Sequence, residues 1–389
     1  MSGRRAFLGS ASGLVAAAGL PRLGRASERT SFFGEHQAGI ATPQPTQTYF
    51  VALDVVTKRP GDIARMFRAW TDAAARLTGG EDAPGDSGET LGLEVSGLTL
   101  TFGLGAGLFD GRYGLAGRRP EALVDLPGFN GDQLVPEHSG GDLSIQACAE
   151  DPQVVFHAVR QLVRLADGVA RVRWAQTGFL PSTPNHATPR NLMGFKDATR
   201  NASDLAASVW VGDEGPAWLR GGSYLVVRKI RMALEHWDKT DVDFQEEVIG
   251  RRKRSGAPLG KDRERDIPDF EAMDADGNPV IAENAHLRMA APETNSGLQI
   301  LRRGYSYNDG ANFTAERWPP WRQGIEYDAG LLFIAYQRDP RMGFIRLFEN
   351  MSKIDALNQF TTHVGSGLFA CPGGTASGQF LAQGLFDAA

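Results

Sequence analysis

Hydrophobic and polar positions form blocks along the chain that predict regular elements from residue 48 onward. Residues 48–56, TYFVALDVV, are rich in β-branched and aromatic residues and predict a strand. Residues 61–80 carry apolar side chains at helical spacing and end in two glycines, so they predict a helix. Residues 91–105 alternate around a Ser-Gly break, which indicates a hairpin or one long strand.

Three further elements are predicted in the first half of the chain. Residues 143–149 predict a strand, residues 151–168 an amphipathic helix and residues 170–179 a final strand. The order β-α-β-β-α-β is that of the ferredoxin-like fold.

A similar order recurs after a loop at 181–206. We predict a strand at 223–232, a helix at 235–250, an irregular polar stretch at 251–285, strands at 298–307 and 331–338, a helix at 343–354 and a strand at 367–372. The expected fold is therefore α+β, with two tandem ferredoxin-like domains at 27–205 and 206–389. Each domain has an antiparallel sheet with helices on one face.

The first 26 residues have a different composition. The paired arginines Arg4 and Arg5 precede a Gly/Ala/Ser-rich apolar run that reaches Leu20 and is too short to span a bilayer comfortably. This order predicts a twin-arginine export signal cleaved after Ala26, and a disordered basic tail is the alternative. We therefore expect a periplasmic or extracellular protein. Twin-arginine export carries folded proteins, so a cofactor loaded before export would suit this route.

Composition and charge exclude several classes of function. The 389 residues are 42% hydrophobic and 22% charged, as in ordinary globular domains. A net charge of −5 leaves no electrostatic footprint for nucleic acid, and the basic run at 251–254 reads as a solvated loop or helix end. The two cysteines, Cys148 and Cys371, cannot form zinc ribbons, iron–sulfur clusters or a covalent haem attachment, and we expect both to be buried small side chains.

No familiar hydrolase or nucleotide motif is present. None of the seven histidines forms HxxxH or HExxH, and neither GxSxG nor a Walker A loop occurs. His157 falls on the apolar stripe of the helix at 151–168, which favours a packing role.

One histidine has arginines at suggestive spacing. His286 is followed by Arg288, and sixteen residues later by Arg302 and Arg303 entering a strand. Imidazole ligates porphyrin iron, and guanidinium groups neutralise propionates or developing negative charge, so this spacing suits a haem. Ordinary ion pairs in strands explain the same arginines, and Asp197 in its glycine-led turn could simply cap that turn.

These segments together resemble the dye-decolourising peroxidases, and most closely their exported, iron-uptake-associated branch, the deferrochelatase/peroxidases. The family's GxxDG motif is matched at Gly194 and Asp197, whereas Ala198 stands where the last glycine is usual. The resemblance covers nearly the whole mature chain, through FFGEHQAGIATP (32–43), GFKDATRN (194–201), AHLRMAAP (285–292), ILRRGYSY (300–307), DAGLLFIAYQRDP (328–340) and HVGSGLFACPGG (363–374).

The resemblance implies a dimeric α/β-barrel-like fold, with two ferredoxin-like units in each chain, and a non-covalent haem b bound mainly by the second domain. His286 would be the proximal iron ligand, Asp197 the distal acid and Arg302 the distal arginine. We choose Arg302 over Arg303 because the family's arginine is followed by one residue and then glycine. The two side chains point to opposite faces of a strand, so only one can face the haem.

Further residues are assigned around this haem. The second nitrogen of His286 would donate to Asp328, with Glu326 as the fallback. Arg288 is expected to contact the cofactor. Phe333 and Leu332 would pack against the porphyrin, although both also read as ordinary strand-core residues.

The implied reaction reduces hydrogen peroxide and oxidises dyes, phenols or other organic donors through a ferryl intermediate. Asp197 would shuttle the peroxide proton and Arg302 would stabilise the charge that develops as the O–O bond breaks. Electrons from bulky donors could pass through Tyr305, Tyr307 or a surface tryptophan. Ordinary strand packing also explains the aromatic residues in strands.

Two other functions stay open at this point. One is release of iron from haem with the tetrapyrrole intact, and the other is a haem carrier without turnover. A carrier needs neither a proton shuttle nor a distal charge, so Asp197 and Arg302 favour the enzyme. Expected partners are the twin-arginine translocon, iron-uptake components and further copies of the chain.

Overall fold

The computed structural model describes residues 29–183, 187–315 and 323–387. The predicted export signal at 1–26 lies outside these residues. Within the described ranges, the helices are all too short or too polar to cross a bilayer.

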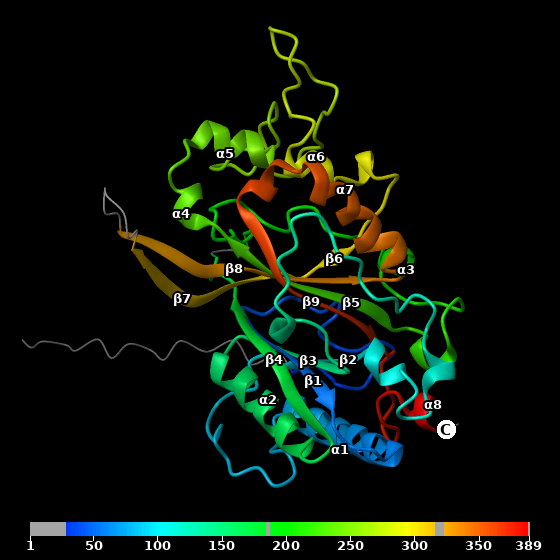
Figure 1. The fold of residues 1–389 in the computed structure, drawn as a ribbon. Helices are drawn as coiled ribbons and strands as arrows, with labels where there is room; N and C mark the ends of the chain where they lie inside the picture. Colours follow the sequence, from blue (N-terminus) through cyan, green and yellow to red (C-terminus); the bar gives the residue numbers. More distant parts are fainter. Residues whose placement is uncertain (1–28, 184–186, 316–322, 388–389) are drawn as a thin grey trace, which may run out of the picture.

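The first half of the chain forms the predicted ferredoxin-like unit. Its strands are ordered β2-β3-β1-β4 and are antiparallel, and helices α1 and α2 pack against one face of them (Figure 1). The elements are β1 (Gln47–Val55), α1 (Pro60–Gly79), β2 (Thr99–Gly105), β3 (Leu143–Ala149), α2 (Pro152–Leu165) and β4 (Ala170–Phe179).

The second half repeats this arrangement. The strands are ordered β9-β5-β8-β7, so each takes the place of its counterpart in the first half, with β6 added at the edge of β8. The elements are α3 (Leu205–Ser208), β5 (Ser223–Met232), α4 (Leu234–Trp237), α5 (Val242–Ile249), α6 (His286–Ala290), β6 (Leu301–Arg302), β7 (Tyr305–Ala315), β8 (Gln323–Gln337), α7 (Arg346–Ile354), β9 (Thr361–Cys371) and α8 (Gln383–Phe386).

Several predicted boundaries differ from the observed ones. Of the alternating segment 91–105 only β2 is a strand, because Ser96 and Gly97 both adopt positive φ and turn the chain. The single helix predicted at 235–250 is two helices, because Asp241 caps α5 by accepting a hydrogen bond from the Phe244 amide.

The strands of the second half are also divided and extended. The strand predicted at 298–307 is divided into β6 and β7 at Arg303 and Gly304, although the Arg303 amide still donates to the Ile334 carbonyl of β8 at 2.8 Å. Strands β8 and β9 are longer than the 331–338 and 367–372 segments. A π turn at Arg341–Ile345 precedes α7.

The two units join into one closed sheet. β2 pairs with β9, β4 pairs with β7 through Phe179 and Ser306, and β5 pairs with β8, so the strands form a barrel-like ring. At the second joint, a β-carbon on Gly178 would lie 2.7 Å from that of Tyr305, which only glycine avoids. The helices cover the outside of the ring, with α1 and α2 on one side and α4 to α7 on the other (Figure 1).

The barrel interior is built by both halves. Phe50 and Trp174 from the first half pack with Tyr336 and Phe369 from the second. Cys148 and Cys371 are buried there as free thiols, which confirms the expectation of two small buried side chains. Because the sheet is continuous, the domain boundary at residue 205 stays a prediction.

Candidate active site

The acid of the GFKDATRN segment lies in a turn that the local sequence constructs. The Asn191 side chain accepts hydrogen bonds from the amides of Met193 and Phe195, and Gly194 has a φ of 86°. Ala198 has a φ of 62°, in the left-handed region that favours glycine. The turn therefore keeps a conformation suited to the missing glycine. Within it, Asp197 Oδ1 accepts the Ala198 amide at 2.7 Å.

Arg302 is hydrogen-bonded to this acid. Its Nη1 donates to Asp197 Oδ1 at 3.1 Å, and its Nη2 donates to the carbonyl of Arg200 at 3.1 Å. The Asn201 side chain holds the backbone of Arg302 with two hydrogen bonds of 2.8 Å. The same motif thus supplies the acid and fixes the strand that carries the arginine.

Arg303 points the other way. It is buried, and its Nη1 donates to the carbonyl of Thr42 in the N-terminal segment. Strand alternation therefore separates the two arginines as predicted, with Arg302 beside Asp197 and Arg303 in a structural contact.

His286 begins the short helix α6 and is held by a buried carboxylate. Its Nδ1 lies 2.8 Å from Oδ2 of Asp355, whose side chain is only 2% exposed. Burial disfavours the charged imidazole, but the charge and hydrogen bond of Asp355 outweigh it and raise the pKa of His286. Arg302 and Asp197 also act on this pKa, in opposite directions, so their charges reach the imidazole.

Asp355 replaces the carboxylates that were expected from the sequence. Asp328 was predicted to hold His286 and Glu326 was the fallback, and both assignments are wrong. Asp328 lies on β8 with its carboxylate 3.9 Å from Lys229 Nζ, whereas Glu326 pairs with Arg231 at 3.2 Å. Asp355 follows α7 instead, where its other oxygen accepts the Leu357 amide at 2.9 Å.

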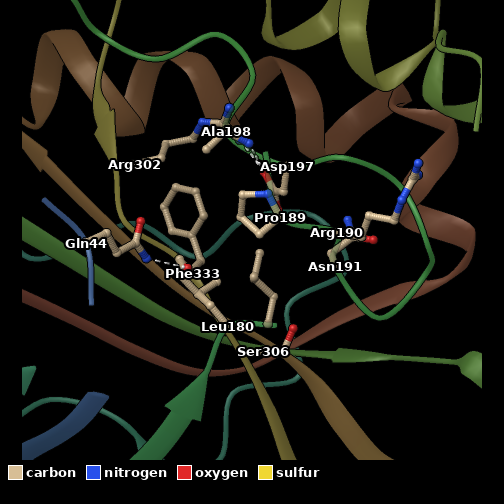
Figure 2. A pocket seen from close by; sticks show the side chains of 12 residues that line it. Gln44, Leu180, Pro189, Arg190, Asn191, Asp197, Ala198, Arg302, Ser306 and Phe333 are labelled. Atoms are coloured by element: carbon tan, nitrogen blue, oxygen red, sulfur yellow. Dashed lines mark hydrogen bonds and ion pairs between the residues drawn. The ribbon is translucent and has the colours of Figure 1, made fainter. Parts of the chain in front are cut away.

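A cavity that is partly open to solvent contains the acid and the arginine (Figure 2). Phe333 projects into its centre, between Arg302 and Pro189, in Figure 2. Its wall consists of Gln44, Leu180, Pro189, Arg190, Asn191, Asp197, Ala198, Arg302, Gly304, Ser306, Leu331 and Phe333.

The remaining predicted residues are distributed differently. Leu332 is fully buried among the barrel-interior residues, so its neighbours Leu331 and Phe333 line the cavity instead. Arg288 is not part of the wall either. Its Nη1 donates to the carbonyl of Phe270 at 2.9 Å, which anchors the 251–285 segment to α6.

Tyr305 and Tyr307 are both fully buried on β7. The Tyr305 hydroxyl lies 3.5 Å from the thiol sulfur of Cys148, and the Lys229 ammonium lies 4.6 Å from the centre of the Tyr307 ring. An electron route through either tyrosine stays a prediction.

Sequence reasoning missed Asp355 and most of the cavity wall, including Arg190 and Asn191. Asn191 and Arg190 line the cavity, and Arg190 also donates to the carbonyls of Gly194 and Lys253. Their position directly before the acid motif was the available signal. Asp355 resembles an ordinary turn cap in sequence, so nothing local marked it.

Comparison with known proteins agrees with this fold. Residues 37–180 match the family described as Dyp-type peroxidase, N-terminal, and residues 188–376 match Dyp-type peroxidase, C-terminal. The chain is 41% identical over 388 residues to a dye-decolorizing peroxidase of Thermobifida fusca, with 94% of this chain and 87% of that protein covered. It is 37% identical over 371 residues to a deferrochelatase of Escherichia coli, with 89% and 85% covered.

A solved structure shows the same architecture. An oxyferrous complex of DtpA from Streptomyces lividans superposes with a TM-score of 0.87 and 41% identity, covering 93% of this chain and 98% of that one. The protein is therefore an enzyme of the peroxidase class. More narrowly, the chain belongs to the Dyp-type peroxidase family.

Proposed function

We propose that the protein is a haem b-dependent peroxidase that reduces hydrogen peroxide and oxidises dyes, phenols or related organic donors. The observation that carries this proposal is the hydrogen-bonded Asp197–Arg302 pair in a cavity wall, together with a His286 that is held by the Asp355 carboxylate. The name of the Streptomyces lividans structure supports iron as the reactive centre in a relative.

The residues present fit a non-covalently bound haem. His286 uses Nδ1 for Asp355, and its Nε2 makes no hydrogen bond to any residue in the described ranges, so that nitrogen is available for iron. The His286 side chain is 33% exposed, so it is not closed off by surrounding protein atoms. Leu331 and Phe333 supply an apolar wall, and Arg302 supplies a positive charge.

When bound, the haem would supply the two oxidising equivalents that peroxide delivers and organic donors consume. Peroxide must lose a proton from one oxygen and gain one on the other. Asp197 Oδ1 is engaged by Arg302 and the Ala198 amide, whereas Oδ2 has no hydrogen bond to the part of the chain that the structure describes. Asp197 Oδ2 is therefore the atom that would take and return the proton.

Arg302 and Asp355 would have electrostatic roles. The Arg302 guanidinium, which donates to Asp197 Oδ1, would offset negative charge that develops on the peroxide. Asp355 holds the proton of His286 on Nδ1, so that Nε2 presents its lone pair, and it raises the basicity of the imidazole.

The test is rapid mixing of the haem-loaded protein with hydrogen peroxide. We expect the wild type to react, and at least one of Asp197→Asn and Arg302→Leu to slow the reaction by about 10²-fold or more, the usual worth of general acid–base groups. Asp213 and Arg220 form an exposed ion pair, so Asp213→Asn and Arg220→Leu are matched controls that should react normally. A wild-type protein that binds haem and never reacts with peroxide would refute the proposal.

A second candidate function is removal of iron from haem with the tetrapyrrole left intact. The observation that favours it is the 37% identity to a protein named deferrochelatase. Incubation with haem under reducing conditions would then produce fluorescent metal-free protoporphyrin. A haem carrier remains the third candidate, and the Asp197–Arg302 pair argues against it because a carrier needs no proton shuttle.

We also propose export by the twin-arginine pathway to the periplasm or the outside of the cell. The support is the Arg4-Arg5 pair followed by a short apolar run. Replacing both arginines by lysine should retain the precursor in the cytoplasm, and unchanged export would refute this route.

A further inference from the structure

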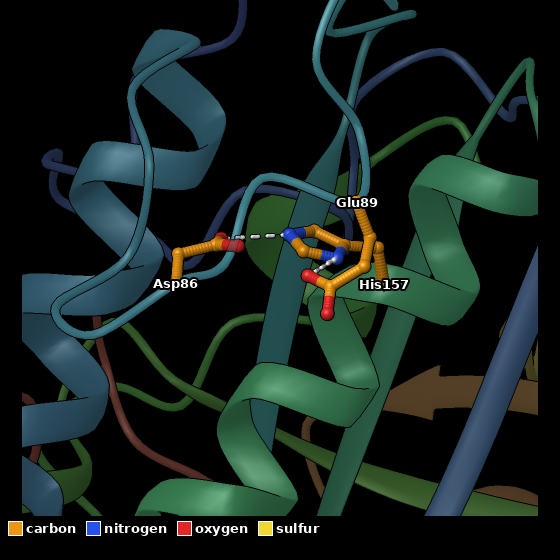
Figure 3. A group of neighbouring side chains, drawn as sticks. All are labelled: Asp86, Glu89 and His157. Carbon is orange, nitrogen blue, oxygen red and sulfur yellow. Dashed lines mark hydrogen bonds and ion pairs between the residues drawn. The ribbon is translucent and has the colours of Figure 1, made fainter.

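A cluster of metal-ligating side chains lies on the first half of the molecule, apart from the cavity of Figure 2. His157 extends from α2, while Asp86 and Glu89 come from the segment that connects α1 to β2 (Figure 3). Ligand atoms from the three side chains lie within 4.8 Å of one another. None of the three lines the proposed active site.

The two nitrogens of His157 have different surroundings. Nε2 lies 2.8 Å from Oδ2 of Asp86, a normal hydrogen bond. Nδ1 is buried without a hydrogen-bond partner among the described residues, although the side chain is only 4% exposed. It points at Oε2 of Glu89, 3.8 Å away, as Figure 3 shows.

That separation is too long for a hydrogen bond and suits a bridging cation. Hydrogen bonds to oxygen span about 2.7–3.2 Å, whereas two ligands about 2.1 Å from a zinc ion lie roughly 3.4 Å apart or more as their angle opens. A buried imidazole nitrogen left without a partner is costly, and metal coordination would satisfy it.

The carboxylates are arranged to support such an ion. Glu89 uses Oε1 to accept from Ser87 at 2.8 Å and to pair with Arg160 at 3.3 Å, which leaves Oε2 facing Nδ1. Asp86 Oδ1 accepts the Gly88 amide at 2.9 Å, which orients the carboxylate so that Oδ2 lies 2.8 Å from Nε2 of His157.

We propose that His157 Nδ1 and Glu89 Oε2 bind a divalent transition-metal ion such as Zn²⁺, with Asp86 holding the imidazole in the required tautomer. A carboxylate, a histidine and a metal in this sequence form a recurrent arrangement in metalloproteins. Water would complete the coordination, because Glu89 is 32% exposed. The ion would fasten the α1–β2 segment to α2.

The test is calorimetric titration of the mature, untagged, haem-loaded protein with ZnCl₂ at neutral pH, after treatment with a chelator. We expect about one equivalent to bind and to raise Tm by mass action. His157→Gln and Glu89→Gln should each abolish this binding. Asp86→Asn should weaken it by about 10–100-fold, as the loss of such outer partners usually does.

The controls separate a specific site from general effects. His236 is exposed on α4, and His236→Gln should bind Zn²⁺ like the wild type. Glu89 is partly exposed, so Glu89→Gln should keep the wild-type circular dichroism and Soret spectrum even if His157→Gln does not fold. The proposal would be overturned if Zn²⁺ did not bind stoichiometrically, or if binding were unchanged in Glu89→Gln. A His157 imidazole that carries protons on both nitrogens in saturating Zn²⁺ would also overturn it.

Discussion

Ala198 has a β-carbon and nevertheless adopts a left-handed backbone conformation, directly beside the proposed proton shuttle. Its φ of 62° is adopted in the turn that carries Asp197 to Arg302. A β-carbon in this conformation costs about 1–2 kcal/mol. The site therefore keeps its geometry at some cost in stability, which surrounding contacts such as the Asn201 clamp on Arg302 can offset.

We predict that Ala198→Gly stabilises the protein by about 0.5–1 kcal/mol, because relief of the left-handed strain exceeds the extra entropy of glycine in the unfolded chain. Urea unfolding of the haem-free protein measures this change. The matched substitution Ala75→Gly in the middle of α1 should instead lose about 1 kcal/mol. A loss of stability in Ala198→Gly would show that the turn does not strain the alanine.

Asp355 is the second residue whose role can be isolated. We predict that Asp355→Asn weakens haem binding by about 10–100-fold, because the imidazole of His286 loses the carboxylate that orients it and raises its basicity. Titration of the haem-free protein with haem, followed at the Soret band, measures the affinity. Asp328→Asn is the control and should bind as the wild type does. Equal affinities of the two variants would exclude this role for Asp355.

At the scale of elements, β5 and β9 are joined by a buried polar network. Arg228 on β5 is fully buried, and it donates to His363 Nδ1 at 2.9 Å and to Ser366 Oγ at 3.0 Å on β9. A third contact pairs it with Asp132. Burial and the neighbouring Arg228 charge hold the pKa of His363 well below its ordinary value of 6.5.

This network makes stability depend on pH. Below about pH 6.5 the unfolded chain protonates His363 while the folded protein does not, so the free energy of unfolding falls as pH falls. The contribution of this group is about 1.4 kcal/mol per pH unit. Urea unfolding between pH 7 and pH 5 should show a smaller loss in His363→Gln, whose amide oxygen can still accept from Arg228. The same slope in both proteins would refute the assignment.

At the scale of the whole molecule, the two ferredoxin-like units are parts of one body. The largest hydrophobic cluster combines Phe102 and Leu104 of the first half with Tyr224, Leu368 and Leu385 of the second. The barrel interior is likewise shared. Separation would expose two large apolar faces and the unpaired edges of the joined strands.

We therefore predict that neither residues 29–183 nor residues 187–389 fold alone. Each fragment should be insoluble or lack a cooperative unfolding transition when expressed by itself, and the two should co-purify when expressed together. A soluble fragment of either range with cooperative unfolding would contradict this view of the barrel.

The sequence by itself determined most of the local structure and the main candidate residues. Periodic burial marked the β-α-β-β-α-β order twice, and strand alternation separated Arg302 from Arg303. The resemblance of its motifs to a known family singled out Asp197 and His286. These features are readable because they depend on neighbouring positions along one element.

Tertiary structure decided what depends on segments far apart in the chain. The partner of His286 is Asp355, 69 residues away, because α7 ends beside α6. The pairings that close the barrel also decided that Leu331 lines the cavity while Leu332 fills the interior. A local pattern indicates which side chains are buried. The fold of the whole chain decides which residues those side chains pack against.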